Sequence, residues 1–408
     1  MKIGIYGGTF NPIHLGHMEA ARFAAEYLKL DQLCLVPTGI PPHKQLEPDA
    51  PSPEQRLEMA ELAAGSIGPD VQVSDAELRR EGRSYTLDTL RQFRKEHPGD
   101  KLYLLMGTDM FLTFHRWRDP GEIAKLCTLC AFGRSEKDTE TLFAVQREFL
   151  KETYQADSVT IALPHITDIS STQLREALGR GEGREFLDPA VYGFILREGL
   201  YGVNADLKHL PLDQLRCVSM SMLKHSRMAH VLGTEETAAK LALRWDVDVE
   251  AARRAALLHD CTKRLNGEQH EQIIRQYHIE LDPVEAGEVK LYHAITGAAV
   301  ARHVFGVSKE IESAIRWHTT GKANMTTLEK IIYLADYIEP NRDFCDLTEL
   351  RELAARDLDA ALLLGLEMSI KSIQDRGIEV NSHSVQARDY LKGKHPHEQN
   401  KRQTGGRP

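Results

Sequence analysis

The sequence has little cysteine, no excess of basic residues and no long hydrophobic run, and each shortage excludes a class of protein. Six cysteines among 408 residues are too few for a fold held together by disulfides. A net charge of −9 argues against a protein that coats nucleic acid. No apolar run approaches the roughly 18 residues of a membrane span, and we expect no signal peptide. We therefore expect a cytoplasmic protein whose partners include neither nucleic acid nor membrane.

Hydrophobic residues make up 42% of the chain, which is enough for two or three globular cores. Residues 1–202 alternate short apolar runs with helical stretches, which predicts an α/β domain with a parallel sheet. Residues 212–392 are almost continuously helical, which predicts an all-α bundle. We expect a linker at 203–211 and a disordered tail at 393–408.

A turn rich in glycine and histidine follows the first apolar run. It contains Gly7, Gly8, His14 and His17, and an amphipathic helical stretch follows at 18–29. Backbone N–H groups at a strand-to-helix turn favour bound phosphate, and glycine lets the backbone approach a ligand closely. Two imidazoles three residues apart could contact the same phosphates.

A second polar motif lies near the end of the α/β half. Ser170, Ser171 and Thr172 are residues of the types that begin helices, and Arg175 adds a positive charge one turn later. Their hydroxyl and N–H groups could hold a triphosphate. An ordinary helix cap is the alternative interpretation.

Together these motifs resemble the two signatures of the nucleotidyltransferase superfamily that transfers adenylyl or cytidylyl groups. The residues between them resemble the branch that adenylates nicotinate mononucleotide, and the likeness covers about residues 1–202. It implies a Rossmann-like domain that binds ATP and nicotinate mononucleotide. The residues that it implies for binding are Gly7, Gly8, Thr9, Phe10, Gly16, Lys44, Ser84, Tyr85, Thr86, Gly107, Asp109, Trp117, Arg134, Ile169, Ser170, Ser171, Thr172 and Arg175.

The chemistry that this resemblance implies is in-line attack by the mononucleotide phosphate on the α-phosphorus of ATP. Such transfer depends on positioning and charge stabilisation, which we assign to His14, His17, Lys44 and Arg175. Mg²⁺ would arrive with the triphosphate. Asn11 stands where relatives often carry Asp, so we do not expect an acid to be required there.

The helical half contains four histidines and two aspartates within or at the end of apolar stretches. Ionisable groups are costly to bury unless they are paired or bound to metal, so several of them on inward faces need a common partner. Imidazole and carboxylate together suit iron, manganese or zinc. The residues predicted to form this metal centre are His225, His259, Asp260, His293, His318 and Asp336. His230 lies five residues from His225, off its helical face, and is left out of the predicted site.

This pattern resembles the HD hydrolase superfamily, over about residues 212–392. Residues 318–321 and 335–342 resemble the branch that hydrolyses diadenosine tetraphosphate symmetrically to two ADP. The resemblance implies two metals, with iron as the expected element, bridged by Asp260. It assigns His225, His259 and Asp336 to one metal, and His293 and His318 to the other. Water activated by the metals would attack a central phosphorus, with Asp260 as the shared ligand.

Two cations near this predicted centre have two interpretations. Lys263, one turn beyond Asp260, and Arg342 could neutralise phosphate oxygens of the substrate. They could equally be solvated surface charges.

Three alternatives remain open at this point. The first half could use another acceptor, such as nicotinamide mononucleotide or phosphopantetheine. The second half could hydrolyse a guanosine alarmone or a deoxynucleoside triphosphate. Either half could be a catalytically inactive sensor or scaffold. The sequence does not determine the oligomeric state, or whether the two sites communicate.

Overall fold

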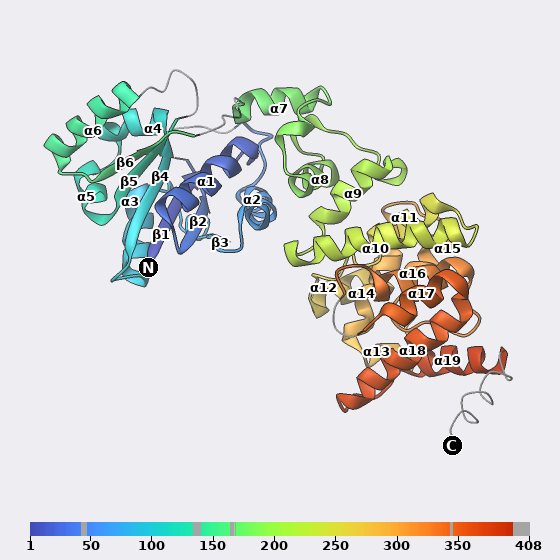
Figure 1. The fold of residues 1–408 in the computed structure, drawn as a ribbon. Coiled ribbons are helices and arrows are strands. Elements are labelled where there is room, and N and C mark those ends of the chain that lie inside the picture. The colour runs from blue at the N-terminus through green and yellow to red at the C-terminus, as the bar shows by residue number, and fades with distance from the viewer. Residues whose placement is uncertain (42–46, 134–139, 164–166, 168, 343–345, 395–408) are drawn as a thin grey trace. The chain divides into compact units, whose positions relative to one another are not determined.

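The computed structural model describes residues 1–41, 47–133, 140–163, 167, 169–342 and 346–394 (Figure 1). The chain divides into two compact units, Met1–Ala205 and Asp206–Pro408. Lys44 and Arg134, both predicted to bind substrate, lie outside the described residues, as do residues 395–408 of the predicted tail. Among the helices described, none is long and apolar enough to cross a membrane.

A parallel sheet of six strands forms the centre of the first unit, which confirms the predicted α/β fold. Its strands lie in the order β3-β2-β1-β4-β5-β6, so the order reverses between β1 and β4. Ligands of such sheets bind outside the carboxyl ends of the strands, next to this reversal. The strands are β1 (Lys2–Gly8), β2 (Gln32–Pro37), β3 (Val71–Val73), β4 (Lys101–Gly107), β5 (Thr128–Phe132) and β6 (Ser158–Ile161).

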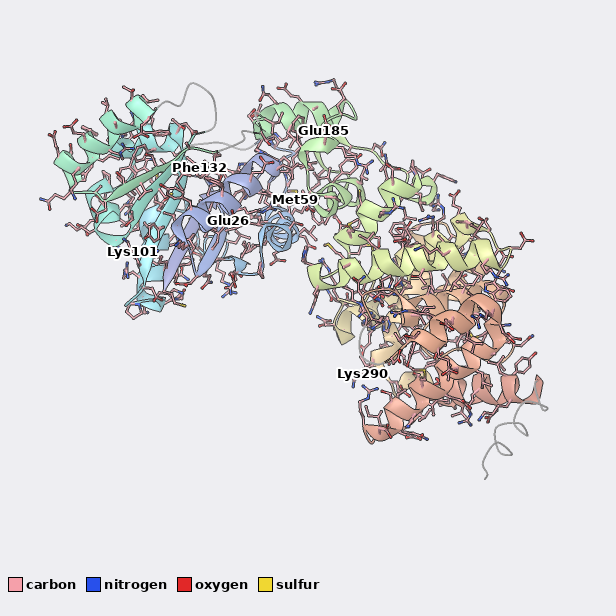
Figure 2. All side chains as sticks on the ribbon, in the orientation of Figure 1. Glu26, Met59, Lys101, Phe132, Glu185 and Lys290 are labelled. Atoms are coloured by element: carbon pink, nitrogen blue, oxygen red, sulfur yellow. The ribbon has the colours of Figure 1, made fainter. Side chains whose placement is uncertain are left out.

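The central strands are apolar on both sides. All five residues of β5 are buried, including Phe132 (Figure 2), and so are Leu104 on the neighbouring strand β4 and Ile5 on β1. Strands covered on both faces are continuous apolar runs, which is why short runs sufficed to predict them. The helices of this unit are α1 (Leu15–Leu28), α2 (Pro53–Ile67), α3 (Thr86–Glu96), α4 (Thr108–Leu112), α5 (Pro120–Leu126), α6 (Glu140–Tyr154), α7 (Ser171–Gly179) and α8 (Pro189–Glu198).

Helices alone make up the regular structure described in the second unit, apart from short 3₁₀ turns, as the sequence predicts. The long helix α10 packs against α11 and α16, and α14 packs against α15. The predicted metal ligands lie on these five helices or in the turns that directly follow them. The helices are α9 (Leu212–Ser221), α10 (His225–Arg244), α11 (Val249–Leu258), α12 (Gly267–Gln276), α13 (Pro283–Ala286), α14 (Tyr292–His303), α15 (Lys309–Arg316), α16 (Thr327–Ile338), α17 (Thr348–Arg356), α18 (Leu358–Asp375) and α19 (Ser382–Lys394).

Candidate active sites

A cavity of about 420 Å³ lies at the carboxyl ends of β1 and β4 in the first unit. The turn after β1 and the start of α7 both line it, although they are distant in sequence. The fold therefore brings together the two motifs that the sequence predicts to act on one ligand. The predicted residues that line the cavity are Gly7, Gly8, Thr9, Phe10, His17, Ser84, Tyr85, Thr86, Gly107, Trp117, Ser170, Ser171, Thr172 and Arg175.

Among the predicted residues that the structure describes, four do not line the cavity: His14, Gly16, Asp109 and Ile169. His14 is buried, and its ring centre lies 3.8 Å from that of His17. The backbone N–H of His14 donates to Nδ1 of His17 at 3.3 Å, so His14 orients its neighbour. A Cβ on Gly16 would lie 3.1 Å from the backbone oxygen of Thr167 and 3.2 Å from the His14 ring, so this tight space favours glycine. Asp109 is exposed on α4.

The start of α7 forms an ordinary capping box, which was the alternative interpretation of this motif. Ser170 Oγ accepts the N–H of Gln173 at 3.2 Å, and Gln173 Oε1 accepts the N–H of Ser170 at 3.0 Å. The same helix end lines the cavity, so the cap and the binding role are compatible. Helix N-termini of this kind favour phosphate.

Asn11 joins the two motifs as a neutral residue. Its carbonyl accepts Nη1 of Arg175 at 2.9 Å, across 164 positions of sequence. Its side-chain Oδ1 accepts the hydroxyl of Tyr201 at 2.8 Å. Asn11 is buried, and a carboxylate there would have to be desolvated. Asn11 therefore links the two motifs through its backbone carbonyl, and this link does not need an acidic side chain at position 11.

Arg56 is a residue of this site that the sequence analysis missed. It is fully buried on α2, where Nη1 donates to the carbonyls of Thr9 at 2.9 Å and Thr38 at 2.6 Å. Nη2 donates to the carbonyl of Gly39 at 2.9 Å. Arg56 thus fixes the loop after β1 to the end of β2. A usable signal was its helical spacing from the apolar residue Met59, which places a charge on the buried face.

Aromatic and charged side chains meet at the other end of the cavity. Trp117 is half-buried against Phe114, with ring centres 5.4 Å apart. The guanidinium of Arg118, which the sequence analysis did not single out, lies 4.7 Å from the ring centre of Tyr85. Glu77 also lines the cavity, and burial raises the pKa of its carboxyl group. This end can accept a flat ring that carries an anionic group near Arg118.

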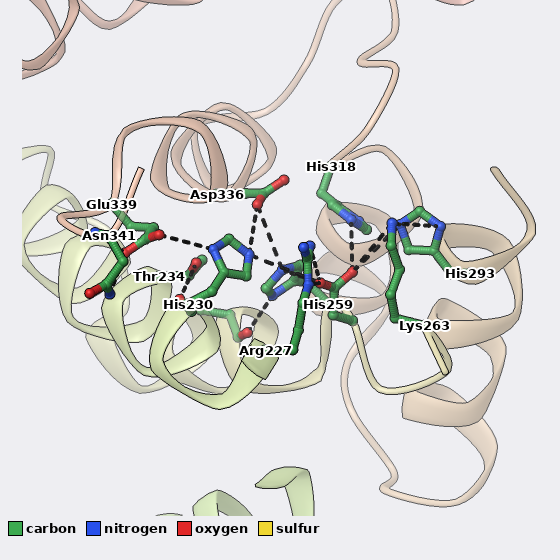
Figure 3. A network of polar contacts seen from close by, with 12 residues as sticks. Arg227, His230, Thr234, His259, Lys263, His293, His318, Asp336, Glu339 and Asn341 are labelled. Atoms are coloured by element: carbon green, nitrogen blue, oxygen red, sulfur yellow. Dashed lines mark hydrogen bonds and ion pairs between the residues drawn. The ribbon is translucent and has the colours of Figure 1, made fainter. Parts of the chain in front are cut away.

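In the second unit, six ionisable side chains converge from different helices and turns (Figure 3). They form overlapping groups whose candidate ligand atoms lie within 4.8 Å of one another. Asp260 faces two ways: Oδ2 lies 3.4 Å from Nε2 of His259, and Oδ1 lies 3.5 Å from Nε2 of His293. The six residues are His230, His259, Asp260, His293, His318 and Asp336.

The prediction of His225 as a ligand is wrong, because the structure places His230 there instead. His225 is exposed in the first turn of α10 and belongs to none of the groups of candidate ligands among the described residues. His230 is buried, and its Nε2 lies 3.0 Å from Oδ1 of Asp336. Five residues correspond to about 140° around a helix, so the two rings cannot face the same side. The spacing of small residues could have identified His230 as buried, since Thr234 and Ala238 follow it at intervals of four on the buried face of α10.

The histidines of this centre are all oriented by their Nδ1 atoms. Nδ1 of His259, His293 and His318 each lies within hydrogen-bond distance of a backbone carbonyl three residues earlier, at 2.6, 2.9 and 2.7 Å. Nδ1 of His230 faces Oε1 of the buried Glu339 at 3.1 Å. With Nδ1 donating its hydrogen, the Nε2 atoms of His293 and His318 keep a lone pair directed into the centre.

The charges of the centre influence one another strongly. Burial disfavours the charged form of Asp260, but His259 and His318 outweigh it and hold the pKa of Asp260 well below its ordinary range. Burial, together with His318 and Lys263, lowers the pKa of His293 to about 3. Burial and His259 lower the pKa of His318 to about 4. An ionised carboxylate therefore lies beside two neutral imidazoles, which is the protonation state that metal ligands need.

These residues fit a divalent metal. Nε2 of His259 and Oδ1 of Asp260 are buried and form no hydrogen bond with any described residue. Unpaired buried polar atoms are costly, and both point into the same centre. The donor set of imidazole nitrogens and carboxylate oxygens suits iron, manganese or zinc.

Three cations surround the metal ligands. Nζ of Lys263 lies 2.8 Å from Nε2 of His293, and Nη2 of Arg342 donates to Oδ1 of Asp336 at 2.6 Å. These contacts rule out the interpretation of both as purely solvated charges. Arg227, which the sequence analysis missed, donates from Nε to Oδ2 of Asp260 at 2.6 Å.

Comparison with known proteins separates the two halves. Residues 5–177 match the model of the cytidylyltransferase-like family, and residues 227–341 match the model of the HD domain. The HD domain therefore lies in the second unit and does not overlap the cytidylyltransferase-like match.

Individual relatives resemble only half of the chain. A probable nicotinate-nucleotide adenylyltransferase from Trichlorobacter lovleyi is 38% identical over 213 residues, which cover 49% of this chain and 99% of the relative. One from Caldicellulosiruptor saccharolyticus is 37% identical over 202 residues, with the same two shares. The crystal structure of a predicted HD superfamily hydrolase involved in NAD metabolism, from Clostridium acetobutylicum, is 39% identical. It covers 45% of this chain and 98% of that protein, with a TM-score of 0.44.

Proposed function

The chain belongs, through its first half, to the nicotinate-nucleotide adenylyltransferase family, and on that premise we propose that this unit transfers AMP from ATP to nicotinate mononucleotide. The products would be deamido-NAD and pyrophosphate. The observation that carries the proposal is the single cavity that joins the phosphate-binding turn of β1 to the aromatic end at Trp117. A dinucleotide product needs both environments in one space.

The residues of the cavity suggest how the transfer proceeds. The turn after β1 and the N-terminus of α7 would hold the triphosphate, with Mg²⁺ bound to its oxygens. The mononucleotide phosphate attacks the α-phosphorus, and the bond to the pyrophosphate oxygen breaks. His17 and Arg175 would stabilise the charge on the transferring and leaving oxygens. Lys44 stays a predicted contributor to this charge stabilisation.

Comparing acceptors tests this proposal. We expect turnover with nicotinate mononucleotide and ATP to exceed turnover with nicotinamide mononucleotide or phosphopantetheine by at least about tenfold, because Arg118 favours an anionic ring substituent. Chromatography of the dinucleotide products measures this. Equal rates, or a preference for the amide, would contradict the assignment.

For the second unit we propose symmetric hydrolysis of diadenosine tetraphosphate to two ADP at a centre of two metals, with iron as the expected element. Asp260 carries this proposal, because its two carboxylate oxygens face separate sets of imidazoles. Bound metals would acidify a water molecule and polarise phosphate oxygens. Arg227, Lys263 and Arg342 would neutralise the remaining charge of the polyphosphate chain.

Product analysis tests the second proposal. Purified full chain incubated with diadenosine tetraphosphate should release ADP alone, since attack at a central phosphorus divides the molecule equally. The variant Asp260→Asn should release none, while Asp375→Asn, at an exposed position on α18, should behave as the natural chain. ATP plus AMP as products would refute symmetric cleavage. Faster turnover of a guanosine alarmone or a deoxynucleoside triphosphate would refute the substrate.

A further inference from the structure

We propose that the two metal positions of the second unit bind their ions with unequal affinity, and that Lys263 opposes binding at the weaker one. The inference rests on the proposed metal chemistry of this unit and goes beyond it. The strong position is formed by His230, His259, Oδ2 of Asp260 and Asp336. The weak position is formed by Oδ1 of Asp260, His293 and His318.

Ligand number and charge differ between the two positions. The strong position offers two imidazole nitrogens and oxygens of two carboxylates, since Nε2 of His230 and Nε2 of His259 each lie within 4.0 Å of both Asp260 and Asp336. The weak position offers two imidazole nitrogens and one oxygen of Asp260, whose charge is shared with the other side. Affinity for a divalent cation rises with the number and charge of its ligands.

The strong position is also held more rigidly. Glu339 is fully buried and accepts Nδ1 of His230, while its Oε2 accepts the backbone and side-chain N–H groups of Asn341 at 2.7 and 2.8 Å (Figure 3). Gly233 makes room for this arrangement, because a Cβ there would overlap Oε2 of Glu339. Partners of this kind fix a ligating ring and raise its basicity. Nδ1 of His293, in contrast, lies 2.9 Å from the backbone carbonyl of Lys290, which is neutral where Glu339 is a carboxylate.

Lys263 directly opposes metal binding at the weak position. Its ammonium lies 2.8 Å from Nε2 of His293, the atom that would bind the ion. A neutral imidazole nitrogen has one lone pair, so it cannot accept from an ammonium and ligate a metal together. Lys263 must therefore move before His293 binds an ion.

Arg227 does not oppose binding at the strong position in the same way. Its Nε donates to Oδ2 of Asp260 at 2.6 Å and its Nη2 lies 2.5 Å from the same oxygen. Both N–H groups belong to one guanidinium and approach from one side, whereas a carboxylate oxygen has two lone pairs. That oxygen can therefore hold the hydrogen bond and a metal at once.

A metal titration tests the inference on the full chain. Metal-free protein titrated with Mn²⁺ in a calorimeter should bind two ions in two steps, with dissociation constants that differ by at least about tenfold. Lys263→Met removes the donor while keeping most of the side-chain length, and should tighten the second step by about tenfold without changing the first. Lys371→Met removes an exposed charge on α18, away from these ligands, and should change neither step.

Further variants address the strong position. Glu339→Gln and Gly233→Ala should each weaken the first step by about 10- to 100-fold and leave the second unchanged. Two equal steps, a single bound ion, or a second step that Lys263→Met weakens or leaves unchanged would overturn the inference. Should Lys263→Met fail to fold, Lys263→Gln and the titration of the natural chain keep the test decisive.

The inference and the proposed function can fail separately. Two unequal steps in a chain that does not cleave diadenosine tetraphosphate would refute only the substrate. Two equal steps in a chain that releases two ADP would refute only the inference.

Discussion

The cavity of the first unit is made mainly of backbone, glycine and hydroxyl groups, whereas the centre of the second unit is made of buried ionisable side chains. In the first unit, Gly7, Gly8 and the N-terminus of α7 offer N–H groups at the edge of a sheet. In the second unit, His259, Asp260 and their neighbours are paired with one another inside a helical bundle. A backbone site acts through preorganised dipoles, while a cluster of buried ligands needs a bound cation.

This difference leads to different vulnerabilities. Single side-chain changes in the first unit should reduce the rate in steps, because several donors share the charge of the phosphates. Changes to a shared ligand in the second unit should abolish activity. The predictions below test this contrast, beginning with the largest effect.

Removing the shared carboxylate should have the largest effect. Asp260→Asn should lower hydrolysis of diadenosine tetraphosphate by at least about 10³-fold, because both metal positions lose a charged ligand. Deamido-NAD formation should be unchanged. Measuring both products on one preparation checks this. Equal loss of both activities would mean that the sites are not independent.

Removing one donor in the first unit should cost less. His17→Ala should lower adenylyl transfer by about 10²- to 10³-fold, as expected when one of several groups that stabilise transition-state charge is lost. His115→Ala, exposed in the same unit, is the matched control and should leave the rate unchanged. Initial rates at saturating ATP measure the effect. A loss of less than about fivefold would remove His17 from the catalytic groups.

His230 and His225, both on α10, distinguish the metal site seen in the structure from the one predicted from the sequence. His230→Gln should lower the affinity for the first metal by about 10- to 100-fold, because the buried ligand is lost. His225→Gln should not change it, because that ring is exposed. Metal content after dialysis provides the measurement. The reverse result would restore the interpretation based on sequence.

A positioning effect in the first unit should be smaller. Arg56→Lys keeps the charge but cannot reach three carbonyls, so the loop after β1 should become less ordered. We expect kcat to fall by about tenfold and KM for ATP to rise. Arg91→Lys, at an exposed position on α3, is the control. An unchanged kcat and KM would show that the loop does not depend on Arg56.

The smallest effect concerns acid stability of the metal-free chain. The pKa values of His293 and His318 are lowered to about 3 and about 4 in the folded chain, from an ordinary value of 6.5. Between pH 6.5 and 4 the unfolded chain therefore binds more protons, so the free energy of unfolding falls as the pH falls. The slope is at most about 1.4 kcal/mol per pH unit for each imidazole.

Calorimetry of metal-free protein at several pH values measures this slope. The unfolding transition of the second unit is identified as the one that moves to higher temperature when metal is added. The variant His318→Gln should flatten the slope, because one of the two titrating rings is gone. A slope that stays equal in the variant would contradict the assignment.

Much of the fold was predictable because its signals are local. Apolar runs such as Leu102–Met106 predicted the strands, and the turn from Gly7 to His17 pointed to the edge of the sheet at which the cavity lies. The choice between His225 and His230 failed because the helical phase was counted from His225, whereas the buried face of α10 includes His230, Thr234 and Ala238. Arg56 was missed because its three partners lie in loops distant from it in sequence, and only the fold shows them.

The central claim is that one chain carries two independent chemistries, of which one depends on tightly bound transition metal. The most direct test strips the full chain of metal with a chelator, adds back Mg²⁺ alone, and assays both reactions on the same sample. Mg²⁺ prefers oxygen ligands and should not replace a metal held by imidazoles. We predict full deamido-NAD formation and less than about 1% of the original ADP release, restored by Fe²⁺ or Mn²⁺. Undiminished ADP release, or loss of both activities together, would contradict the account.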